Sequence, residues 1–212
     1  MSKRCYIAGA GEFNENELPK KSDYVIAADN GYTALLSNGI TPDMVVGDFD
    51  SLGSIPDHSN VIQSPAEKDD TDMMLAVKQA LELGYKKLLI NGCLGGRLDQ
   101  TYANMQILTY IAESGVHGIL IGRTSNVTAI RNGSIAFNPT TQSRAISVFS
   151  AGDKAVGVTL KGLKYPLDSV TLTNTYPIGV SNEFTGSPAI ISVENGTLII
   201  IWDGGLQDLC ET

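Results

Sequence analysis

The first 123 residues alternate short apolar runs with longer stretches in which apolar residues recur at helical spacing. The short runs are rich in branched side chains and bounded by Gly, Asn or Pro, as is typical of buried strands. They span residues 4–10, 24–29, 44–50, 87–91 and 118–122. Helical spacing marks residues 72–83 and 100–114, which end before Gly84 and Gly115. This alternation predicts a mainly parallel sheet, with ligands bound at the carboxyl ends of its strands.

From about residue 124 the helical periodicity disappears, and short strand-like runs follow one another. They span residues 127–131, 135–137, 145–149, 156–160, 169–173, 189–193 and 198–202. Asn132-Gly133 and Asn195-Gly196 lie between such runs and predict hairpin turns, because these residue types tolerate the positive φ angles of a type I′ turn. We therefore expect an α/β domain at residues 1–123 and an all-β domain, a small sandwich or barrel, at residues 124–212.

Composition narrows the class of protein. The 212 residues are 42% hydrophobic and 18% charged, which indicates a packed globular chain. Its formal charge of -8 disfavours nucleic acid and anionic membranes as partners. We see no signal peptide and no apolar run that would span a bilayer, so we expect a cytoplasmic protein. Cys5, Cys93 and Cys210 are widely spaced without a CxxC pair, so we expect free thiols rather than disulfides or a zinc site.

Two carboxylates, Asp48 and Asp50, lie at the end of the third predicted strand. If the extended conformation continues, residues i and i+2 lie on one face, where their charges repel unless a cation lies between them. Magnesium prefers hard oxygen ligands and commonly binds one or two carboxylates together with phosphate oxygens. A solvated turn is the alternative interpretation of this short motif.

A second acidic stretch, residues 68–72 (Lys-Asp-Asp-Thr-Asp), opens a predicted helix. In the simplest interpretation Asp69 or Asp70 caps this helix and the other carboxylates interact with its dipole. Asp69 and Asp72 would also share a helical face, and could join the carboxylates of the first motif around a cation. Lys68 would then reach a phosphate group.

A third segment, residues 91–100, ends a strand, passes through glycines and enters a helix. Gly95 and Gly96 would let backbone amides approach an anion at the positive end of the helix, and Arg97 adds a fork of donors. A plain strand-to-helix connection is the alternative. The turn at residues 9–11 (Gly-Ala-Gly) is a weaker signal of the same kind. Three motifs at strand ends predict one site for metal and phosphates, and hence phosphoryl or pyrophosphoryl transfer.

Together, the motifs at residues 47–51, 68–72 and 95–99 closely resemble those of the thiamine pyrophosphokinase family in order and spacing. The resemblance continues at residues 162–167 and 179–184 and thus covers nearly the whole chain. It implies a mainly parallel α/β domain that binds ATP, then a β-sandwich domain that binds thiamine, in a homodimer with thiamine near the subunit interface. The implied reaction transfers a pyrophosphoryl group from Mg²⁺-ATP to the thiamine hydroxyl, giving thiamine diphosphate and AMP.

The resemblance also implies roles for individual residues on the nucleotide side. Asp48, Asp50 and Asp72 match the carboxylates that hold magnesium and ATP, with Asp69 in support. Arg97 and Asp99 match the family's Gly-Gly-Arg-x-Asp site and are, with Asp72, the catalytic candidates. The other candidate nucleotide-binding residues are Asp29, Gly31, Ser51, Lys68, Thr71, Gly95 and Gly96.

On the thiamine side, the resemblance points to Ser181, Asn182 and Phe184. An aromatic ring such as Phe184 would stack on a cationic or heteroaromatic ring, while Ser181 and Asn182 would address the aminopyrimidine edge. Packing of Phe184 in a β core is the alternative.

We expect the thiamine hydroxyl to attack the β-phosphorus of ATP, with AMP as the leaving group. Asp72 is the first candidate for accepting the hydroxyl proton and Asp99 the second. The chain departs from the family at Asn30, where Gly is common, and at Gln100, where many bacterial relatives have His. Two other functions remain open: a magnesium-nucleotide-dependent diphosphokinase for another alcohol, and a non-catalytic nucleotide sensor.

Overall fold

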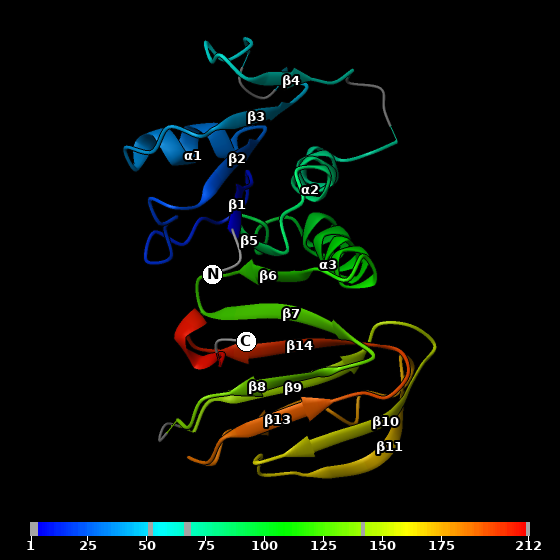
Figure 1. Cartoon of the computed structure of the whole chain (residues 1–212). Coiled ribbons are helices and arrows are strands. Elements are labelled where there is room, and N and C mark those ends of the chain that lie inside the picture. The colour runs from blue at the N-terminus through cyan, green and yellow to red at the C-terminus, as the bar shows by residue number, and fades with distance from the viewer. Residues whose placement is uncertain (1–3, 51–52, 66–68, 141–142, 211–212) are drawn as a thin grey trace. The chain divides into compact units, whose positions relative to one another are not determined.

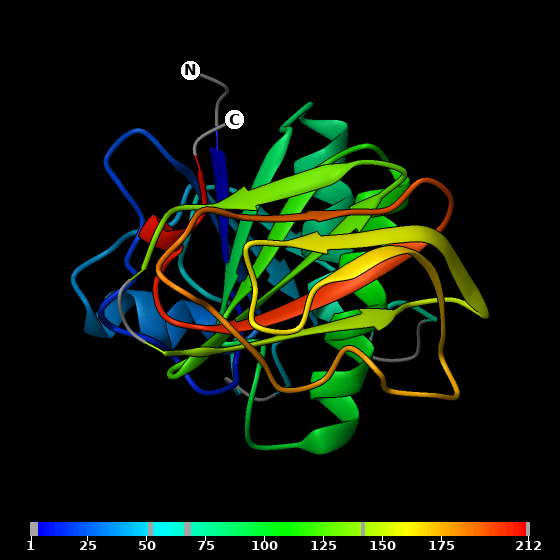
Figure 2. The ribbon, with the colours of Figure 1, turned by 90° about the horizontal axis from the view of Figure 1, so that it is seen from below.

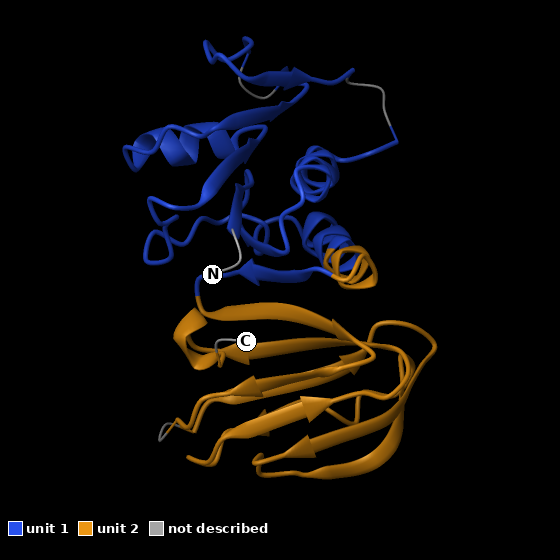
Figure 3. Ribbon diagram, in the orientation of Figure 1, with its two compact units in different colours: residues 1–107, 116–123 blue, residues 108–115, 124–212 orange. Residues whose placement is uncertain are grey.

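The computed structural model describes residues 4–50, 53–65, 69–140 and 143–210, and the chain is a mixed α/β protein. It divides into two compact units (Figure 3). Unit 1 comprises residues 1–107 and 116–123, and unit 2 comprises residues 108–115 and 124–212. Among the described residues, no helix has both the length and the apolar character needed to cross a membrane.

Unit 1 is built on a parallel sheet. Its elements are β1 (Arg4–Ala8), β2 (Tyr24–Ala28), α1 (Gly31–Ser37), β3 (Met44–Gly47), β4 (Val61–Gln63), α2 (Asp72–Glu82), β5 (Lys87–Asn91), α3 (Leu98–Glu113, whose last turns are grouped with unit 2) and β6 (His117–Ile121). The strand order in this unit is β6-β5-β1-β2-β3-β4, and each pair is parallel. The predicted parallel sheet is therefore confirmed, while α1 and β4 are elements that the periodicity did not reveal.

The strand order explains where a ligand site forms in unit 1. The chain runs from β1 through β4 in one direction and then returns to place β5 and β6 on the other side of β1. Because parallel crossovers are right-handed, this reversal puts α1 on one face of the sheet and α2 and α3 on the other, as Figure 1 shows. The order reverses between β1 and β5, and an open α/β sheet binds ligands at the carboxyl ends of the strands at such a point.

Helix α2 shows why these residues form these elements. Its buried face consists of Met73, Ala76, Val77 and Ala80, at helical spacing, and it packs on β1, β2 and β3. The Thr71 hydroxyl accepts a hydrogen bond from the Met74 amide at 3.1 Å and so caps the first turn. Capping by an aspartate at this position, the simplest interpretation of the sequence, is therefore wrong.

Unit 2 consists mainly of antiparallel strands. These are β7 (Ser125–Arg131), β8 (Ser134–Phe137), β9 (Ala145–Ser150), β10 (Lys154–Lys161), β11 (Leu167–Thr173), β12 (Asn182–Glu183), β13 (Ala189–Ser192) and β14 (Thr197–Asp203), followed by the 3-10 turn η2 (Leu206–Asp208). One group has the order β12-β9-β14-β7, and a second sheet has the order β11-β10-β13-β8. The colours of Figure 2 allow these strands to be followed from green to red.

The two Asn-Gly turns connect strands of different sheets. Asn132-Gly133 joins β7 to β8 and Asn195-Gly196 joins β13 to β14, and neither pair of strands is adjacent in a sheet. The hairpin prediction is therefore wrong at both turns. They meet each other instead, since the Asn132 amide donates to the Gly196 carbonyl at 3.1 Å and the Gly196 amide donates to Asn132 Oδ1 at 2.8 Å. The turns tie together one corner of unit 2.

The core of unit 2 is aromatic at its centre. Trp202 of β14 and Phe137 of β8 are fully buried, with ring centroids 5.5 Å apart in an edge-to-face arrangement. Phe184 packs on Phe137 at 5.4 Å. Because β14 and β8 belong to different strand groups, these rings join the two layers of the unit.

Candidate functional site

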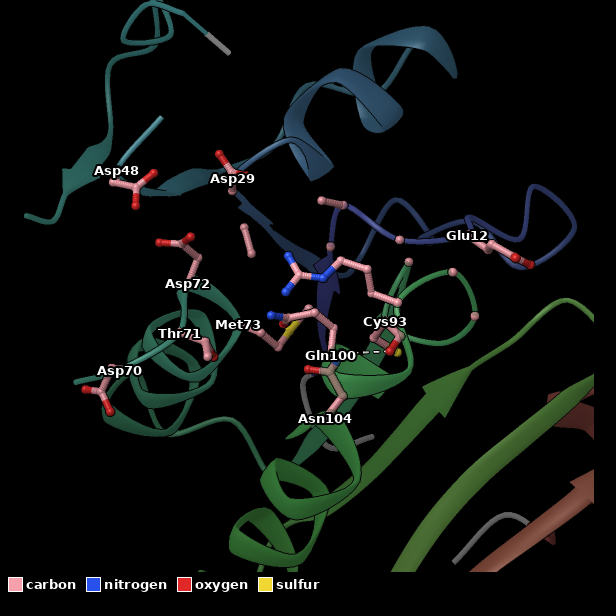
Figure 4. A pocket seen from close by; sticks show the side chains of 18 residues that line it. Glu12, Asp29, Asp48, Asp70, Thr71, Asp72, Met73, Cys93, Gln100 and Asn104 are labelled. Atoms are coloured by element: carbon pink, nitrogen blue, oxygen red, sulfur yellow. Dashed lines mark hydrogen bonds between the residues drawn. The ribbon is translucent and has the colours of Figure 1, made fainter. Parts of the chain in front are cut away.

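Unit 1 contains a cavity of about 720 Å³ at the carboxyl ends of its strands (Figure 4). Its walls combine backbone-rich turns after β1 and β5 with acidic residues after β2 and β3 and at the start of α2. The lining residues are Gly9, Ala10, Gly11, Glu12, Ala28, Asp29, Asp48, Asp70, Thr71, Asp72, Met73, Gly92, Cys93, Gly95, Gly96, Arg97, Gln100 and Asn104. The three sequence motifs thus meet at one place, as the strand-end argument predicts.

The turns after β1 and β5 lie in direct backbone contact. The Gly9 amide donates to the Asn91 carbonyl at 2.7 Å, and the Gly11 amide donates to the Gly92 carbonyl at 2.8 Å. A Cβ atom added at Gly92 would lie 2.4 Å from the Gly9 carbonyl oxygen, and Gly92 also has a φ of +69°. A side chain at this position would therefore separate the two walls of the cavity.

The first acidic motif contributes one carboxylate to the cavity. Strand β3 ends at Gly47, and Phe49 is buried with a left-handed φ of 63°. The extended conformation that would place Asp48 and Asp50 on one face therefore stops before them. Half-buried Asp48 lines the cavity, whereas exposed Asp50 does not. Ser51, a candidate nucleotide-binding residue, lies outside the described residues.

The second acidic motif has divided roles. Asp72, half-buried in the first turn of α2, lines the cavity, as does Thr71, whose hydroxyl caps the helix. Asp70 also lines the cavity and forms an ion pair with Lys78 at 2.6 Å. Asp69 is exposed and outside the lining, and it precedes the helix, so the shared helical face with Asp72 does not form. Lys68 lies outside the described residues.

The third motif forms the glycine-rich wall. Gly95 and Gly96 have φ angles of +78° and +63°, and both line the cavity. Arg97 is exposed at the cavity and pairs with Asp99, which lies outside the lining, at 2.6 Å. The hydrogen bond that Arg97 donates is the main reason why the pKa of the Asp99 carboxyl is lowered. Asp99 in turn raises the pKa of Arg97. Asp99 is therefore the weaker candidate for a general base.

Two candidates follow strand β2. Asp29 has a left-handed φ of 48°, lines the cavity and donates its amide to the Val46 carbonyl at 2.8 Å. Gly31 begins α1 and does not line the cavity. A Cβ atom at Gly31 would lie 2.0 Å from the Ala8 carbonyl oxygen, so a glycine at this position allows α1 to pack closely against β1.

The charge of the lining constrains the ligand. Glu12, Asp29, Asp48, Asp70 and Asp72 are acidic, while Arg97 is the one basic side chain among the lining residues described. An anionic ligand would be repelled here unless a cation accompanied it. Within the described residues, no three His, Cys, Asp or Glu side chains are grouped closely enough to hold a metal. Asp48 and Asp72 instead face the cavity from different elements, an arrangement that suits a hard cation completed by ligand oxygens (Figure 4).

Several lining residues were not among the candidates drawn from the sequence. The turn formed by Gly9, Ala10 and Gly11 had a weak signal, a Gly-Ala-Gly string directly after a strand. Buried Asn104 donates its side-chain Nδ2 to the Cys93 carbonyl at 2.7 Å, a contact between residues 11 positions apart that had no sequence signal. Burial raises the pKa of the Cys93 thiol to about 12, so this lining thiol stays protonated near neutral pH.

The predicted thiamine-side residues lie in unit 2 in contrasting environments. Ser181 is exposed, with a left-handed φ of 57°, and its amide donates to the Ser147 hydroxyl at 3.0 Å. Asn182 is buried, donates to the Tyr165 carbonyl at 2.7 Å and accepts from the Tyr165 amide at 2.9 Å. Phe184 is 4% exposed and packs in the aromatic core. Thiamine binding by this set stays a prediction.

Comparison with known proteins covers both units. The family model "Thiamin pyrophosphokinase, catalytic domain" matches residues 16–120, and "Thiamin pyrophosphokinase, vitamin B1 binding domain" matches residues 133–198. A thiamine pyrophosphokinase of Bacillus subtilis is 31% identical over 182 residues, which are 83% of this chain and 85% of that protein.

Solved structures agree with the sequence comparison. The crystal structure of thiamine pyrophosphokinase from Bacillus subtilis matches with a TM-score of 0.82 at 29% identity, over 96% of this chain and 100% of that chain. That of the enzyme from Geobacillus thermodenitrificans matches with a TM-score of 0.79 at 27% identity, over 97% of this chain and 100% of that chain. On these matches in both halves, the chain belongs to the thiamine pyrophosphokinase family.

Proposed function

We propose that this chain is a thiamine diphosphokinase, which transfers a pyrophosphoryl group from ATP to the hydroxyl of thiamine and releases AMP. The supporting observation is the cavity of unit 1, where an acidic wall faces a glycine-rich turn that carries Arg97. Family membership favours this reaction over phosphorylation of another alcohol or mere nucleotide sensing. The two domains expected from the sequence would then be an ATP-binding catalytic domain (1–123) and a β-sandwich domain (124–212) that binds thiamine.

On the nucleotide side, the backbone of Gly95 and Gly96 would approach the phosphates, and Arg97 would donate to their oxygens from the rim. Asp48 and Asp72 would hold Mg²⁺ together with the phosphates, with Asp50 and Asp69 in support from outside the lining. When bound, the ion would neutralise charge on the pyrophosphoryl group during transfer. This accounts for the binding of a polyanion by an acidic cavity.

Proton removal is assigned to Asp72. It lines the cavity at the start of α2, whereas Asp99 lies outside the lining with a lowered pKa. Asp72 would accept the proton of the thiamine hydroxyl as that oxygen attacks the β-phosphorus, and the bond to the α-phosphate would break to release AMP. Since Gln100 lines the cavity where a histidine is common, it would contribute hydrogen bonds rather than carry a proton.

On the acceptor side, Ser181, Asn182 and Phe184 are the proposed thiamine contacts. We place the thiamine site near the interface of a homodimer and the enzyme in the cytoplasm, as the family resemblance implies. Analytical ultracentrifugation of the purified protein tests the dimer directly, and a monomer at assay concentrations would contradict it.

Product analysis tests the reaction. Purified protein is incubated with ATP and thiamine, with and without Mg²⁺, and products are separated by chromatography. Magnesium-dependent formation of equal amounts of AMP and thiamine diphosphate is expected. ADP with thiamine monophosphate would show attack at the γ-phosphorus instead. ATP binding without either product would support the sensor, and a diphosphorylated product from another alcohol alone would support a different acceptor.

A further inference from the structure

A buried asparagine lies between the two backbone walls of the cavity. Asn91, the last residue of β5, is 0% exposed and does not itself line the cavity. The segment after β1 supplies Gly9 to Glu12 to one wall, and the turn directly after Asn91 supplies the other. Its position is therefore suited to holding the walls together rather than to contacting a ligand.

The Asn91 side chain is fully used in hydrogen bonds. Its Oδ1 accepts from the backbone amides of Asn14 and Gly92, at 2.9 and 2.8 Å. Its Nδ2 donates to the Asn14 carbonyl at 2.9 Å and to the Tyr6 hydroxyl at 2.7 Å. One side chain thus joins strand β1, the loop that follows it and the turn after β5.

The network continues within this loop and reaches the residue directly after β6. The Tyr6 hydroxyl donates to the Glu17 carbonyl at 2.9 Å, and the side-chain Nδ2 of Asn14 donates to the Gly122 carbonyl at 2.7 Å. Burial raises the pKa of Tyr6, so its hydroxyl keeps the proton that it donates to Glu17. We call Asn91, Asn14 and Tyr6 the amide latch.

We propose that Asn91, as the centre of the amide latch, is a positioning residue for the nucleotide. The latch fixes the loop that carries Gly9 to Glu12 against the glycine-rich turn after β5. It thereby sets the distance between these two walls of the cavity, where the phosphates of ATP would bind. This inference rests on the proposed function, because it takes the ligand of the cavity to be the ATP of that reaction. The latch lies entirely in unit 1, so its loss should weaken ATP binding and leave thiamine recognition unchanged.

The distance between the walls leaves little tolerance. A Cβ atom added at Gly11 would lie 2.8 Å from the backbone carbonyl oxygen of Gly92, and the Glu12 carboxylate packs on Gly95. Glu12 is also one of the acidic lining residues. If the loop were released, both the backbone wall and this charge would move relative to the phosphates, which would weaken ATP binding.

Asn91→Ala tests the latch, and the control is loss of a buried asparagine elsewhere in the chain. Asn126 is a second buried asparagine, in unit 2, whose Nδ2 donates to the Gly204 carbonyl at 2.8 Å. Asn91→Ala should raise Kd for Mg²⁺-ATP about tenfold by calorimetry, because it leaves buried amides without partners. It should also speed amide exchange in residues 9–17. Asn126→Ala should lower thermal stability without changing either quantity, which separates positioning from general destabilisation.

Tyr6→Phe is the second variant, for the case in which Asn91→Ala does not fold. It removes one hydroxyl and keeps the ring, so a several-fold rise in Kd for Mg²⁺-ATP and faster exchange near Glu17 are expected. In steady-state assays, the rise should appear in KM for ATP and not in KM for thiamine. Unchanged Kd in every latch variant that folds would overturn the inference. If the wild type binds Mg²⁺-ATP but makes no thiamine diphosphate, the proposed function is wrong. The Kd values of the latch variants, measured by calorimetry, still test the role of Asn91 in that case.

Discussion

Unit 1 and unit 2 place their candidate residues in opposite environments. In unit 1, Asp72 and Arg97 lie at a cavity, half-buried or exposed, and buried backbone contacts hold the surrounding walls. In unit 2, Asn182 and Phe184 are buried and contact other parts of the same unit. The proposed nucleotide site thus presents its side chains to a cavity, whereas two of the three proposed thiamine residues pack within the fold and stabilise it.

The largest effect is expected from Asp72→Asn. If Asp72 removes the proton, the neutral amide should lower kcat for AMP formation by about 10²–10⁴-fold. Thermal stability should change little, because asparagine keeps the size of this half-buried side chain at the start of α2. The control is Glu82→Gln at the other end of α2, outside the cavity, which should keep full activity. Wild-type turnover in Asp72→Asn would remove it from the mechanism.

Phe184→Ala addresses the other half of the comparison. Loss of a buried ring that packs on Phe137 should lower the free energy of unfolding by about 3–5 kcal/mol, measured by urea denaturation. Ser181→Ala, at an exposed neighbouring position, should change that free energy by less than about 0.5 kcal/mol. If Phe184→Ala instead kept full stability and raised only KM for thiamine, the ring would serve the ligand rather than the core.

Much of unit 1 could be predicted from its sequence, because its signals are local. The apolar faces of α2 and α3 and the buried strands are long enough to show their periods, and aspartates after parallel strands must meet at one edge. The left-handed conformation of Phe49 carried no such signal, and it placed Asp50 outside the cavity. The contacts of Asn91 with Asn14 join residues 77 positions apart and depend on strand order, which the sequence pattern does not reveal.

Unit 2 shows the complementary lesson. Its strands, apart from the short β12, are recognisable as strand-like runs, but Asn132-Gly133 and Asn195-Gly196 predict hairpins that do not form. A turn motif reports the local φ and ψ angles, whereas partner choice depends on which faces are buried against each other. Phe184 illustrates the same point for function, because a motif match alone does not separate an aromatic residue of the core from one that contacts a ligand.

Arg97→Ala is expected to have a smaller effect, confined to the nucleotide. Loss of its charged donors should raise KM for ATP about tenfold. Arg97→Lys should have a KM between those of the wild type and Arg97→Ala, because lysine keeps the charge but lacks the paired donors of the guanidinium group. Stability should not change measurably, since the Arg97–Asp99 pair is 73% and 65% exposed. Without the arginine, the pKa of Asp99 should rise toward its usual range, which an NMR titration can follow. An increase in KM for thiamine alone would place Arg97 on the acceptor side.

The smallest expected effect is a difference between the two units in how their stability responds to acid. Both histidines of the chain lie in unit 1, and burial and the nearby Lys87 lower the pKa of His117 from 6.5 to about 4. As the pH falls below 6.5, the unfolded chain binds a proton at this position while the folded chain does not, so stability declines toward pH 4. His117→Gln should remove this part of the pH dependence, measured as the slope of unfolding free energy between pH 7 and about pH 5.

Amide exchange shows which unit responds. Within that pH window, after correction for the intrinsic pH dependence of exchange, protection in β6 and β5 of wild-type protein should decrease, because His117 begins β6 and pairs with Lys87 of β5. Unit 2 has no histidine, so the exchange protection of β14 and β7 should stay constant. Equal loss of protection in both units, or an unchanged slope in His117→Gln, would mean that groups other than this imidazole control the acid response. A loss confined to unit 1 would show that the nucleotide half opens without unfolding of the aromatic core.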